Sequence, residues 1–296
     1  MTLYTHQSEN TKKTWLLMAV FLAITVVIGY FVSYYYNNPG ILYIAIIFSL
    51  VMNITSYWFS DKIALASTGA KEAGENEYRE LHRILENLSI TAGLPKPRLY
   101  IIDDMAPNAF ATGRNKEHSA VAVTKGLLQT LDKNELEGVI AHELAHIGNR
   151  DILLSTVVVV LVGFIAMLSD MFLRMSLFGG RDSENKGNGA LMIVGVIFVV
   201  LSPIIATIIQ LAISRKREFL ADASGALLTR YPEGLANALQ KISSYGQPMQ
   251  KASNATAHMF ISSPFGGKAM KGIAKLFMTH PPVEERISAL LSNGNK

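Results

Sequence analysis

The sequence predicts a mainly α-helical membrane protein with four transmembrane helices and a soluble α+β domain that contains a small β-sheet. Three observations lead to this fold class. Half of the 296 residues are hydrophobic. Only 17% are charged, where an ordinary soluble protein has about 25%. Four long apolar stretches alternate with polar segments that carry helical and strand-like patterns.

The four predicted spans cover residues 14–36, 41–59, 152–173 and 190–213. Each is long enough to cross a bilayer core of about 30 Å as a helix. The first stretch could instead be a signal peptide. However, it is long for the apolar part of a signal, it lacks a small-residue cleavage site, and a second apolar stretch follows it. We therefore expect two transmembrane hairpins, 14–60 and 152–214, after a polar tail at 1–13.

Two polar segments, 61–151 and 215–296, are expected to form the soluble domain. In the first, leucine and isoleucine recur on one face of a predicted amphipathic helix, Glu75–Ala92. Strands are predicted at Arg98–Ile102, Asn108–Thr112 and Ser119–Thr124. Asp132 and Glu135 then have the spacing of a capping box, which predicts the start of another helix.

The second polar segment predicts two further helices, Glu233–Ser244 and Glu284–Leu291. Residues 246–272 lie between them and are rich in Gly, Ser, Ala and Lys. Such a composition, without a clear hydrophobic period, is typical of a loop, and we expect a mobile one.

The distribution of positive charge predicts the orientation of the spans. With four spans, Lys12-Lys13, segment 61–151 and Arg215-Lys216-Arg217 all fall on one side. Positively charged loops mark the cytoplasmic side, so we expect a multi-pass protein of the plasma (inner) membrane with both termini and the soluble domain in the cytoplasm. The chain has no cysteine, which excludes thiolate metal sites. It has no basic tract with interleaved aromatics, so we expect no nucleic-acid partner.

One motif, His142-Glu143-Leu144-Ala145-His146, predicts a metal-dependent hydrolase. Two histidines four residues apart lie on one face of a helix, one turn apart, and both can reach a single ion. Neutral imidazole suits Zn²⁺, and a catalytic zinc site keeps a position open for water. Glu143 lies close enough to touch that water as a general base.

A third protein ligand is needed, and Glu218 and Asp222 are the candidates because they lie four apart on a predicted helix after the fourth span. We expect the helix of the two histidines to continue into the third span, and the helix of the two carboxylates to extend the fourth. Since these spans would be antiparallel neighbours, their cytoplasmic ends could meet and bring a carboxylate to the histidines.

These motifs together resemble the HtpX-type integral membrane metalloproteases, which are related to the CAAX prenyl proteases. The segments that carry the likeness are His142–His146, Glu218–Asp222, Asn108–Gly113, and His280-Pro281-Pro282 with Arg286 after it. The resemblance covers nearly the whole chain, and it implies a zincin-like (gluzincin) protease domain with one Zn²⁺ per subunit. It implies His142, His146 and Glu218 as ligands, Glu143 as the general base, and Asp222 as a residue that supports a ligand.

The same resemblance suggests His280, and less strongly Arg286, as the group that stabilises the oxyanion. The predicted strand Asn108–Thr112 would then be an edge strand beside the cleft, where a peptide could pair with the main chain and Asn108 could bind substrate backbone. The other histidines have no partner at ligand spacing and are expected at the surface; they are His6, His82, His118 and His258.

Three functions remain in competition at this point. The first is a zinc endopeptidase that cleaves misfolded or damaged membrane proteins, or unfolded polypeptides, at the cytoplasmic face of the lipid bilayer. The second is a prenyl-protein processing protease, against which the short four-span plan argues. The third is a metal-binding membrane scaffold or transporter without hydrolysis, against which Glu143 argues, since ligation alone does not need it.

Overall fold

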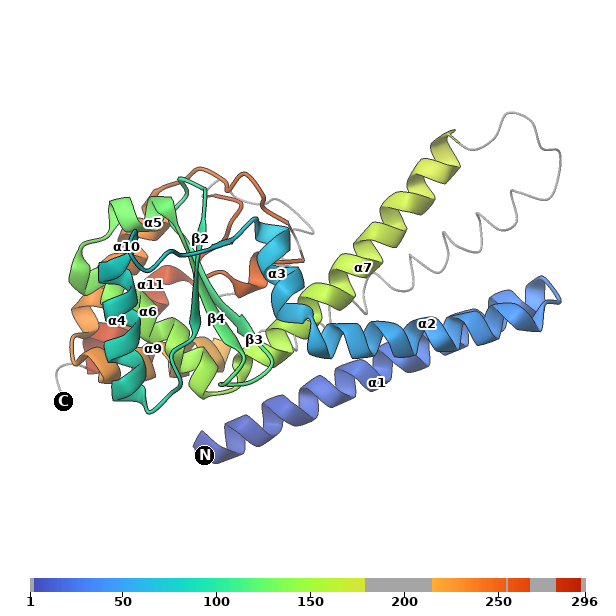
Figure 1. The fold of residues 1–296 in the computed structure, drawn as a ribbon, viewed down its shortest axis with the longest axis horizontal. Coiled ribbons are helices and arrows are strands. Elements are labelled where there is room, and N and C mark those ends of the chain that lie inside the picture. Colours follow the sequence, from blue (N-terminus) through green and yellow to red (C-terminus); the bar gives the residue numbers. More distant parts are fainter. Residues whose placement is uncertain (1–2, 179–214, 254, 267–280, 294–296) are drawn as a thin grey trace.

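The computed structural model describes residues 3–178, 215–253, 255–266 and 281–293. Among them, three long helices project from one side of a compact α+β domain (Figure 1). These helices are α1 (Leu3–Tyr35), α2 (Pro39–Trp58) and α7 (Asp151–Phe178). The fold class predicted from the sequence, mainly helical with a small sheet, agrees with this arrangement.

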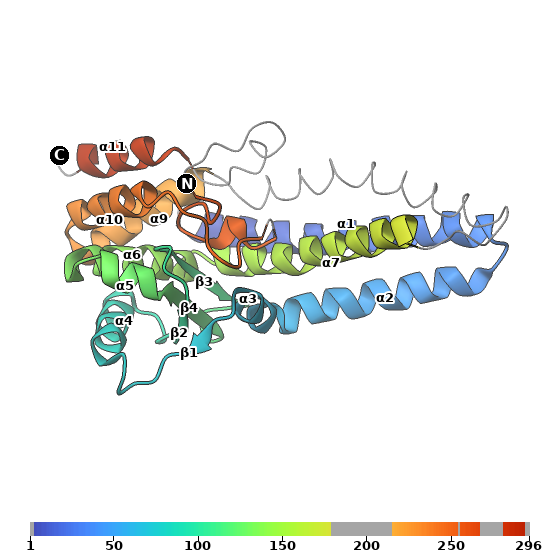
Figure 2. The ribbon, with the colours of Figure 1, turned by 90° about the horizontal axis from the view of Figure 1, so that it is seen from above.

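The three long helices lie side by side (Figure 2). Leu17, Met18 and Phe21 of α1 belong to one buried apolar cluster with Leu154, Val157, Val158, Leu161 and Val162 of α7. The side chain of Asn53 on α2 donates a hydrogen bond from Nδ2 to the Met18 carbonyl oxygen, at 3.3 Å. Apolar packing therefore joins α1 to α7, and a buried polar contact joins α2 to α1.

Two described helices have the length and composition of membrane spans, Ser8–Tyr34 within α1 and Pro39–Trp58. A third candidate exists if the bent pair Lys133–Gly148 and Asp151–Phe164 is counted as one span. The fourth predicted span, 190–213, lies outside the described residues. The polar tail is helical from Leu3 onward and continuous with the first span, because no helix-breaking residue separates them.

The domain contains a mixed four-stranded sheet in the order β1-β2-β4-β3. The short strand β1 (Lys71–Glu72) pairs with β2 (Arg98–Ile102), which runs parallel to β4 (Ser119–Thr124). Strand β3 (Ala109–Gly113) pairs antiparallel with β4 and forms an edge of the sheet. The prediction of an edge strand is thus confirmed, although the strand begins one residue later than expected.

Both faces of the sheet are covered. Its pleat directs Ala109, Ala111, Val121 and Val123 into the main core with α4 and α6, and directs Phe110, Ala120 and Ala122 into a second cluster with Phe260. The domain helices are α3 (Ser60–Thr68), α4 (Arg79–Ala92), α5 (Lys125–Thr130), α6 (Lys133–Gly148), α9 (Arg215–Thr229), α10 (Pro232–Ser244) and α11 (Val283–Asn293). Residues 75–78, predicted to start the first of the amphipathic helices, form a turn instead.

Helix α6 carries both histidines and opens with the predicted capping box: Asp132 accepts from the Glu135 backbone N–H, and Glu135 accepts from that of Asp132. The expectation that this helix continues into the third span is wrong. Helix α6 ends at Gly148, and Arg150 adopts a left-handed conformation with φ of 60°. Helix α7 then begins at an angle of 86° to α6. A left-handed residue beyond the last turn ends a helix, and apolar periodicity on both sides hides such a break in the sequence.

The expectation of a mobile loop at 246–272 is wrong for its central part. Ala257–Met259 form a 3₁₀ turn (η1), and Phe260 and Ile261 after it are fully buried. The ring of Phe260 packs edge-to-face against Phe110 of β3, with ring centroids 5.2 Å apart. Apolar residues in this Gly- and Ser-rich stretch anchor it to the sheet, while residues 267–272 lie outside the described part of the chain.

Candidate metal centre

Helices α6 and α9 cross closely and bring the candidate ligands together. At the crossing, a Cβ atom on Gly225 of α9 would lie 2.9 Å from the backbone nitrogen of His142, so only glycine permits this approach. Gly225 is seven residues, or about two helical turns, after Glu218. Because the helix backbones nearly touch, the carboxylate of Glu218 reaches the two histidines of α6.

The three side chains converge on one point. The Nε2 atoms of His142 and His146 are 3.1 Å apart. Glu218 Oε2 is 3.9 Å from His142 Nε2, and its Oε1 is 3.7 Å from His146 Nε2. Ligand atoms of the three residues all lie within 4.8 Å of one another, and this group could hold a metal ion. The structure thus brings together the three residues that the sequence suggested as ligands.

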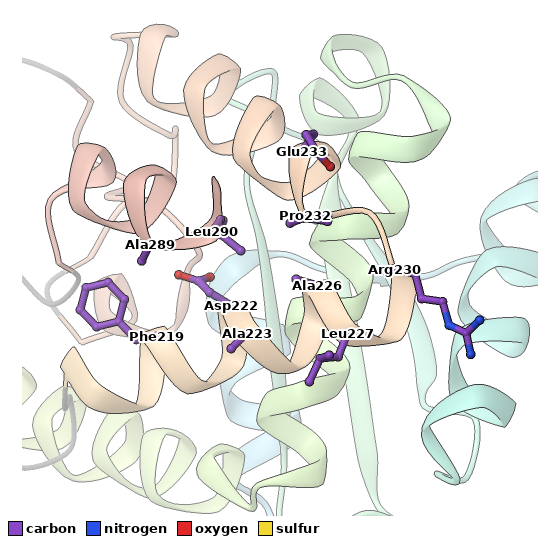
Figure 3. A pocket seen from close by; sticks show the side chains of 10 residues that line it. All are labelled: Phe219, Asp222, Ala223, Ala226, Leu227, Arg230, Pro232, Glu233, Ala289 and Leu290. Atoms are coloured by element: carbon purple, nitrogen blue, oxygen red, sulfur yellow. The ribbon is translucent and has the colours of Figure 1, made fainter. Parts of the chain in front are cut away.

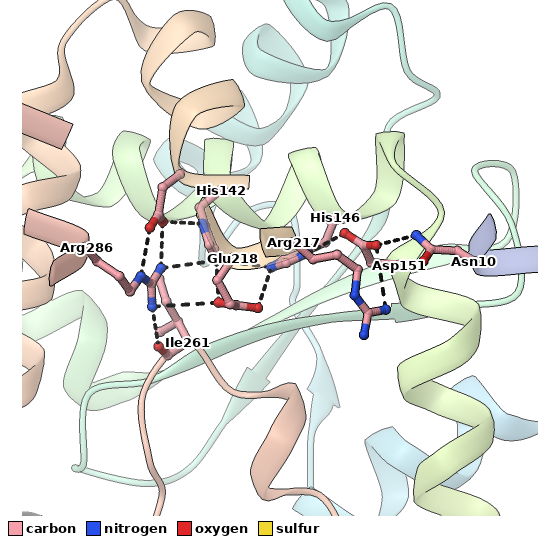
Figure 4. Close-up of polar contacts among 9 residues, drawn as sticks. Asn10, His142, His146, Asp151, Arg217, Glu218, Ile261 and Arg286 are labelled. Carbon is pink, nitrogen blue, oxygen red and sulfur yellow. Dashed lines mark hydrogen bonds and ion pairs between the residues drawn. The ribbon is translucent and has the colours of Figure 1, made fainter. Parts of the chain in front are cut away.

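A carboxylate contacts the outer nitrogen of each histidine (Figure 4). Asp222 Oδ1 lies 3.0 Å from His142 Nδ1, and Asp151 Oδ2 lies 3.0 Å from His146 Nδ1. Such contacts fix the ring orientation and leave Nε2 as the inward-facing nitrogen. Asp222 is where the sequence suggested support for a ligand. Asp151 was missed, because on the continuous helix expected there it would not face a histidine five residues earlier.

Arg286 is almost fully buried beside the site, with 1% of its surface exposed and its Nη2 3.5 Å from His142 Nε2. Its Nε and Nη2 donate to the two oxygens of Asp222, at 2.8 and 2.6 Å. Nη1 donates to the Ile261 carbonyl at 3.1 Å and lies 3.8 Å from Glu218. The guanidinium therefore compensates two buried carboxylates and joins α11 to the site. His280, the other residue suggested as oxyanion stabiliser, lies outside the described residues.

The surroundings move the pKa values of the three central residues of α6 in different directions. Burial lowers the pKa of His142 to about 4, although the Asp222 hydrogen bond acts against it. Burial would also lower the pKa of His146, but the Asp151 hydrogen bond and the charge of Glu218 outweigh it and raise the pKa to about 9. Burial raises the pKa of Glu143 to about 7. A carboxyl group that titrates near neutral pH is suited to general acid–base work.

Asn108, predicted to bind substrate backbone, contacts the backbone of its own chain. Its Nδ2 donates to the Ser262 carbonyl at 2.9 Å, and its Oδ1 accepts from the Ser262 N–H at 3.3 Å. The next residue, Ala109, accepts a hydrogen bond from the Ile261 N–H at 2.9 Å. The first residue of the β3 edge is therefore already paired with the segment that follows η1.

The remaining histidines are not all at the surface. His258 is buried, and its Nε2 lies 2.9 Å from the Ser155 carbonyl, so the prediction of a surface position is wrong there. His82 is half-buried beside the Ala73 carbonyl, whereas His118 is exposed as predicted. Both buried contacts are made with backbone carbonyls, a partner that sequence spacing cannot indicate.

A cavity of about 790 Å³ lies between α9, α10 and α11 (Figure 3). Its described lining is mostly apolar and is formed by Phe219, Asp222, Ala223, Ala226, Leu227, Arg230, Pro232, Glu233, Ala289 and Leu290. Of these, only Asp222 belongs to the polar network around the histidines. The cavity therefore adjoins the metal centre through Asp222 and is distinct from the point on which the three ligands converge.

Comparisons with known proteins show the family to which the chain belongs. The model of peptidase family M48 matches residues 75–293. The chain is 51% identical to the protease HtpX homolog of Thermoanaerobacter pseudethanolicus, over 98% of both chains, and 48% identical to that of Pyrococcus furiosus, over 94% of both. The fold is similar to that of Ste24p from S. mikatae, with a TM-score of 0.50 and 18% identity, covering 97% of this chain and 67% of that one. From the family match and these full-length relatives, we conclude that the chain belongs to peptidase family M48 and is a membrane-bound metalloprotease.

Proposed function

We propose that the protein is a zinc-dependent endopeptidase that cleaves misfolded or damaged membrane proteins where they meet the cytoplasmic face of the membrane. The observation that carries this proposal is the convergence of His142, His146 and Glu218 beside the buried carboxyl group of Glu143. Ligation alone does not require Glu143, so its presence favours a hydrolase over a metal-binding scaffold.

The donor set fits zinc. Two imidazole nitrogens and one carboxylate oxygen form a ligand set found in catalytic zinc sites. Ligand atoms around a tetrahedral zinc ion lie roughly 3.3–3.6 Å apart. The two histidine Nε2 atoms here are 3.1 Å apart, and Glu218 approaches His146 with Oε1 at 3.7 Å and His142 with its other oxygen, Oε2, at 3.9 Å. With one ligand atom from each residue, the three atoms lie within 4.8 Å of one another. His142, His146 and Glu218 would hold one ion per subunit. When bound, zinc supplies a Lewis acid that polarises the scissile carbonyl and lowers the pKa of a bound water.

Glu143 would act as the general base. Its Oε1 is buried and has no hydrogen-bond partner among the described residues, which leaves it available to a water molecule. It would accept a proton from the attacking water and pass that proton to the leaving amine as the peptide C–N bond breaks. In the metal-free protein burial raises the pKa of Glu143 to about 7, while the positive charges of His146 and Arg286 act to lower it.

Three buried residues would position the ligands. Asp222 would orient His142, and Asp151 would orient His146, each through Nδ1. Arg286 is held by two hydrogen bonds from its guanidinium to Asp222, which favours a positioning role for it over direct contact with an oxyanion. His280 remains the candidate for that contact from its sequence motif alone.

An extended substrate would pair with the β3 edge. Because hydrogen bonding alternates along an antiparallel strand, the backbone N–H and C=O groups of Ala109 and Ala111 both point away from β4. The Ala111 N–H donates a hydrogen bond to Glu143. Since Ile261 already pairs with Ala109 and the Ala111 N–H is bonded to Glu143, the substrate would pair with the Ala111 carbonyl oxygen, with Asn108 holding the neighbouring segment in place. Main-chain pairing reads an extended backbone and little sequence, which suits unfolded polypeptides as substrates.

The membrane location of substrates follows from the chain's own spans. We propose four spans, with the protease domain formed by 61–151 and 215–296 on the cytoplasmic side of the plasma (inner) membrane and both termini there. The alternative of prenyl-protein processing is not favoured by any contact described above. The likeness to Ste24p is a likeness of fold at 18% identity.

Replacing Glu143 by glutamine tests the proposed function. Glu143→Gln keeps the shape of the side chain but cannot accept the proton, so peptide hydrolysis should fall at least about 10²-fold. Metal content should stay unchanged, because Glu143 is not a proposed ligand. Glu137→Gln, the same change on the same helix, serves as the matched control and should leave turnover near that of the parent. Turnover of Glu143→Gln close to the parent rate would remove Glu143 from the mechanism.

A further inference from the structure

A polar residue of the first membrane helix lies buried against the metal centre. Asn10 lies in the first turns of α1, before the span expected at 14–36 and near the start of the candidate span Ser8–Tyr34, and only 3% of its surface is exposed. Its Nδ2 donates to Asp151 Oδ1 at 2.6 Å and lies 3.3 Å from the Asn149 carbonyl oxygen. Both acceptors lie at the break between α6 and α7, directly after the histidine motif.

Asp151 stands between Asn10 and a candidate metal ligand (Figure 4). Its Oδ1 faces Asn10, while its Oδ2 faces His146 Nδ1 at 3.0 Å. Arg217 of α9 also approaches Oδ1, with Nη1 at 3.8 Å. A carboxylate held at both oxygens has few orientations open to it. Asn10 therefore limits the rotation of the group that aligns the imidazole of His146.

The position of Asn10 is itself fixed by helix packing. Leu17 lies seven residues after Asn10, and Val158 lies seven after Asp151. Both belong to the buried cluster between α1 and α7, so the two helices run in parallel from the polar contact into the apolar one. Thr14, also buried, donates a hydrogen bond from its hydroxyl to the Asn10 carbonyl oxygen at 2.9 Å. The apolar packing thus sets the register in which Asn10 meets Asp151.

We propose that Asn10 is a positioning residue of the metal centre, and that α1 contributes to metal binding as well as to membrane anchoring. Through Asp151, Asn10 keeps the His146 ring aligned with Nε2 facing the other two ligands. Metal affinity then depends on α1 being seated against α7. The inference rests on the metal site of the proposed function, but not on the reaction or its substrate.

Removing the amide donor tests this inference in the full-length protein. Asn10→Ala should weaken zinc affinity about tenfold, at the low end of the 10–100-fold range for residues that orient ligands. The measurement is competition for zinc with a chromogenic chelator in detergent or proteoliposomes. Asn10→Ser, whose hydroxyl is too short to replace the amide, should show the same loss and serves if the alanine variant does not fold. Unchanged zinc affinity in a folded Asn10 variant would overturn the proposal.

Asn53→Ala is the matched control. It also removes a buried asparagine that donates to a neighbouring helix, but its acceptor is the Met18 carbonyl, away from the histidines. It should change zinc affinity less than twofold, within the scatter of near-neutral changes. An equal loss in both variants would mean that general loosening of the helices explains the effect, which would contradict the proposal.

A double-mutant cycle measures whether Asn10 and Asp151 affect zinc affinity through the same contact. Asp151→Asn should itself weaken zinc binding by about 10–100-fold. In that background Asn10→Ala should have little further effect, because the two residues act through one link. Full additivity of the two losses would refute the link. If the parent protein binds no zinc at all, the proposed function fails; if it binds zinc and Asn10 has no effect, only this inference fails.

Discussion

At the scale of single residues, two histidines of one helix are held in different electrostatic settings. His142 contacts Asp222, whose charge is shared with Arg286, and burial keeps the pKa of this imidazole at about 4. His146 contacts Asp151, which faces both the amide of Asn10 and, at 3.8 Å, the guanidinium of Arg217. The Asp151 hydrogen bond and the charge of Glu218 outweigh burial and raise the pKa of this imidazole to about 9. Because a metal ion binds the neutral ring, metal binding at His146 must release a proton. The two carboxylates thus orient their histidines alike but influence their charge differently.

The roles of the two acidic residues on α9 can be separated by metal content. Glu218→Ala removes a proposed ligand and should abolish zinc binding, since two histidines alone leave the site incomplete. Asp222→Ala removes a supporting contact to His142 and should weaken zinc affinity by about 10–100-fold. Zinc in the purified variants, measured by atomic emission and chelator competition, checks both. An empty Asp222 variant beside a fully loaded Glu218 variant would reverse the assignment.

At the scale of secondary-structure elements, close helix contacts build the site. Two glycines allow neighbours to approach α6: Gly225 of α9 meets the backbone of His142, and Gly138 of α6 meets the backbone of Leu235 on α10. A Cβ at either position would lie within 3 Å of a backbone atom that cannot rotate away. The distance of Glu218 from the histidines is therefore set by the separation of α6 and α9.

Enlarging Gly225 should disturb the site from a distance. Alanine is the better helix former by about 1 kcal/mol, yet Gly225→Ala must push α9 away from α6. Overpacking of this kind lowers the free energy of unfolding by about 1–3 kcal/mol, and zinc affinity should fall with it. Gly163→Ala is the control, since its added Cβ would meet only a side-chain atom at 3.7 Å. Chemical unfolding and zinc competition check the prediction, which fails if the two variants behave alike.

Local signals in the sequence predicted several elements well. The bounds of β2 and β4 and the capping box of α6 agree with the structure, because alternating or capped patterns are encoded by neighbouring residues. The break at Arg150 could not be predicted, since a non-glycine residue takes a left-handed conformation there only in the folded context. Asp151 as the partner of His146 was missed for the same reason, and Phe260 was missed because its partner, Phe110, is distant in the sequence.

At the scale of the whole molecule, the long helices and the protease domain share buried contacts. Helices α1, α2 and α7 extend to one side of the domain (Figure 1). Helix α6 is bent from α7 by 86°, and Asn10 contacts Asn149 and Asp151 at this bend. The sequence predicts that the straight cytoplasmic ends of two spans meet and hold the metal. Because of the bend, α6 is not a straight extension of α7. His146 is instead linked to α1 by hydrogen bonds, from its Nδ1 to Asp151 and from Asp151 to Asn10.

The side of the membrane on which this domain lies can be tested directly. Lys12, Lys13 and the Arg215-Lys216-Arg217 cluster predict the cytoplasmic side. The chain has no native cysteine, so single cysteines report one position at a time. Ser243 is an exposed residue of α10 in the domain, and Asn188 belongs to the loop predicted on the opposite side, outside the described residues.

In intact cells, an impermeant thiol reagent should label Asn188→Cys and leave Ser243→Cys unlabelled, because the reagent reaches only the outer face. After the cells are opened, both positions should react, which controls for exposure of Ser243→Cys. The contact between Asn10 and Asp151 places the start of α1 and the metal centre on one side of the membrane, so the labelling of Ser243→Cys also reports the side of the N-terminus. Labelling of Ser243→Cys in intact cells would place the protease on the outer face and exclude substrates that present their cleavage sites to the cytoplasm.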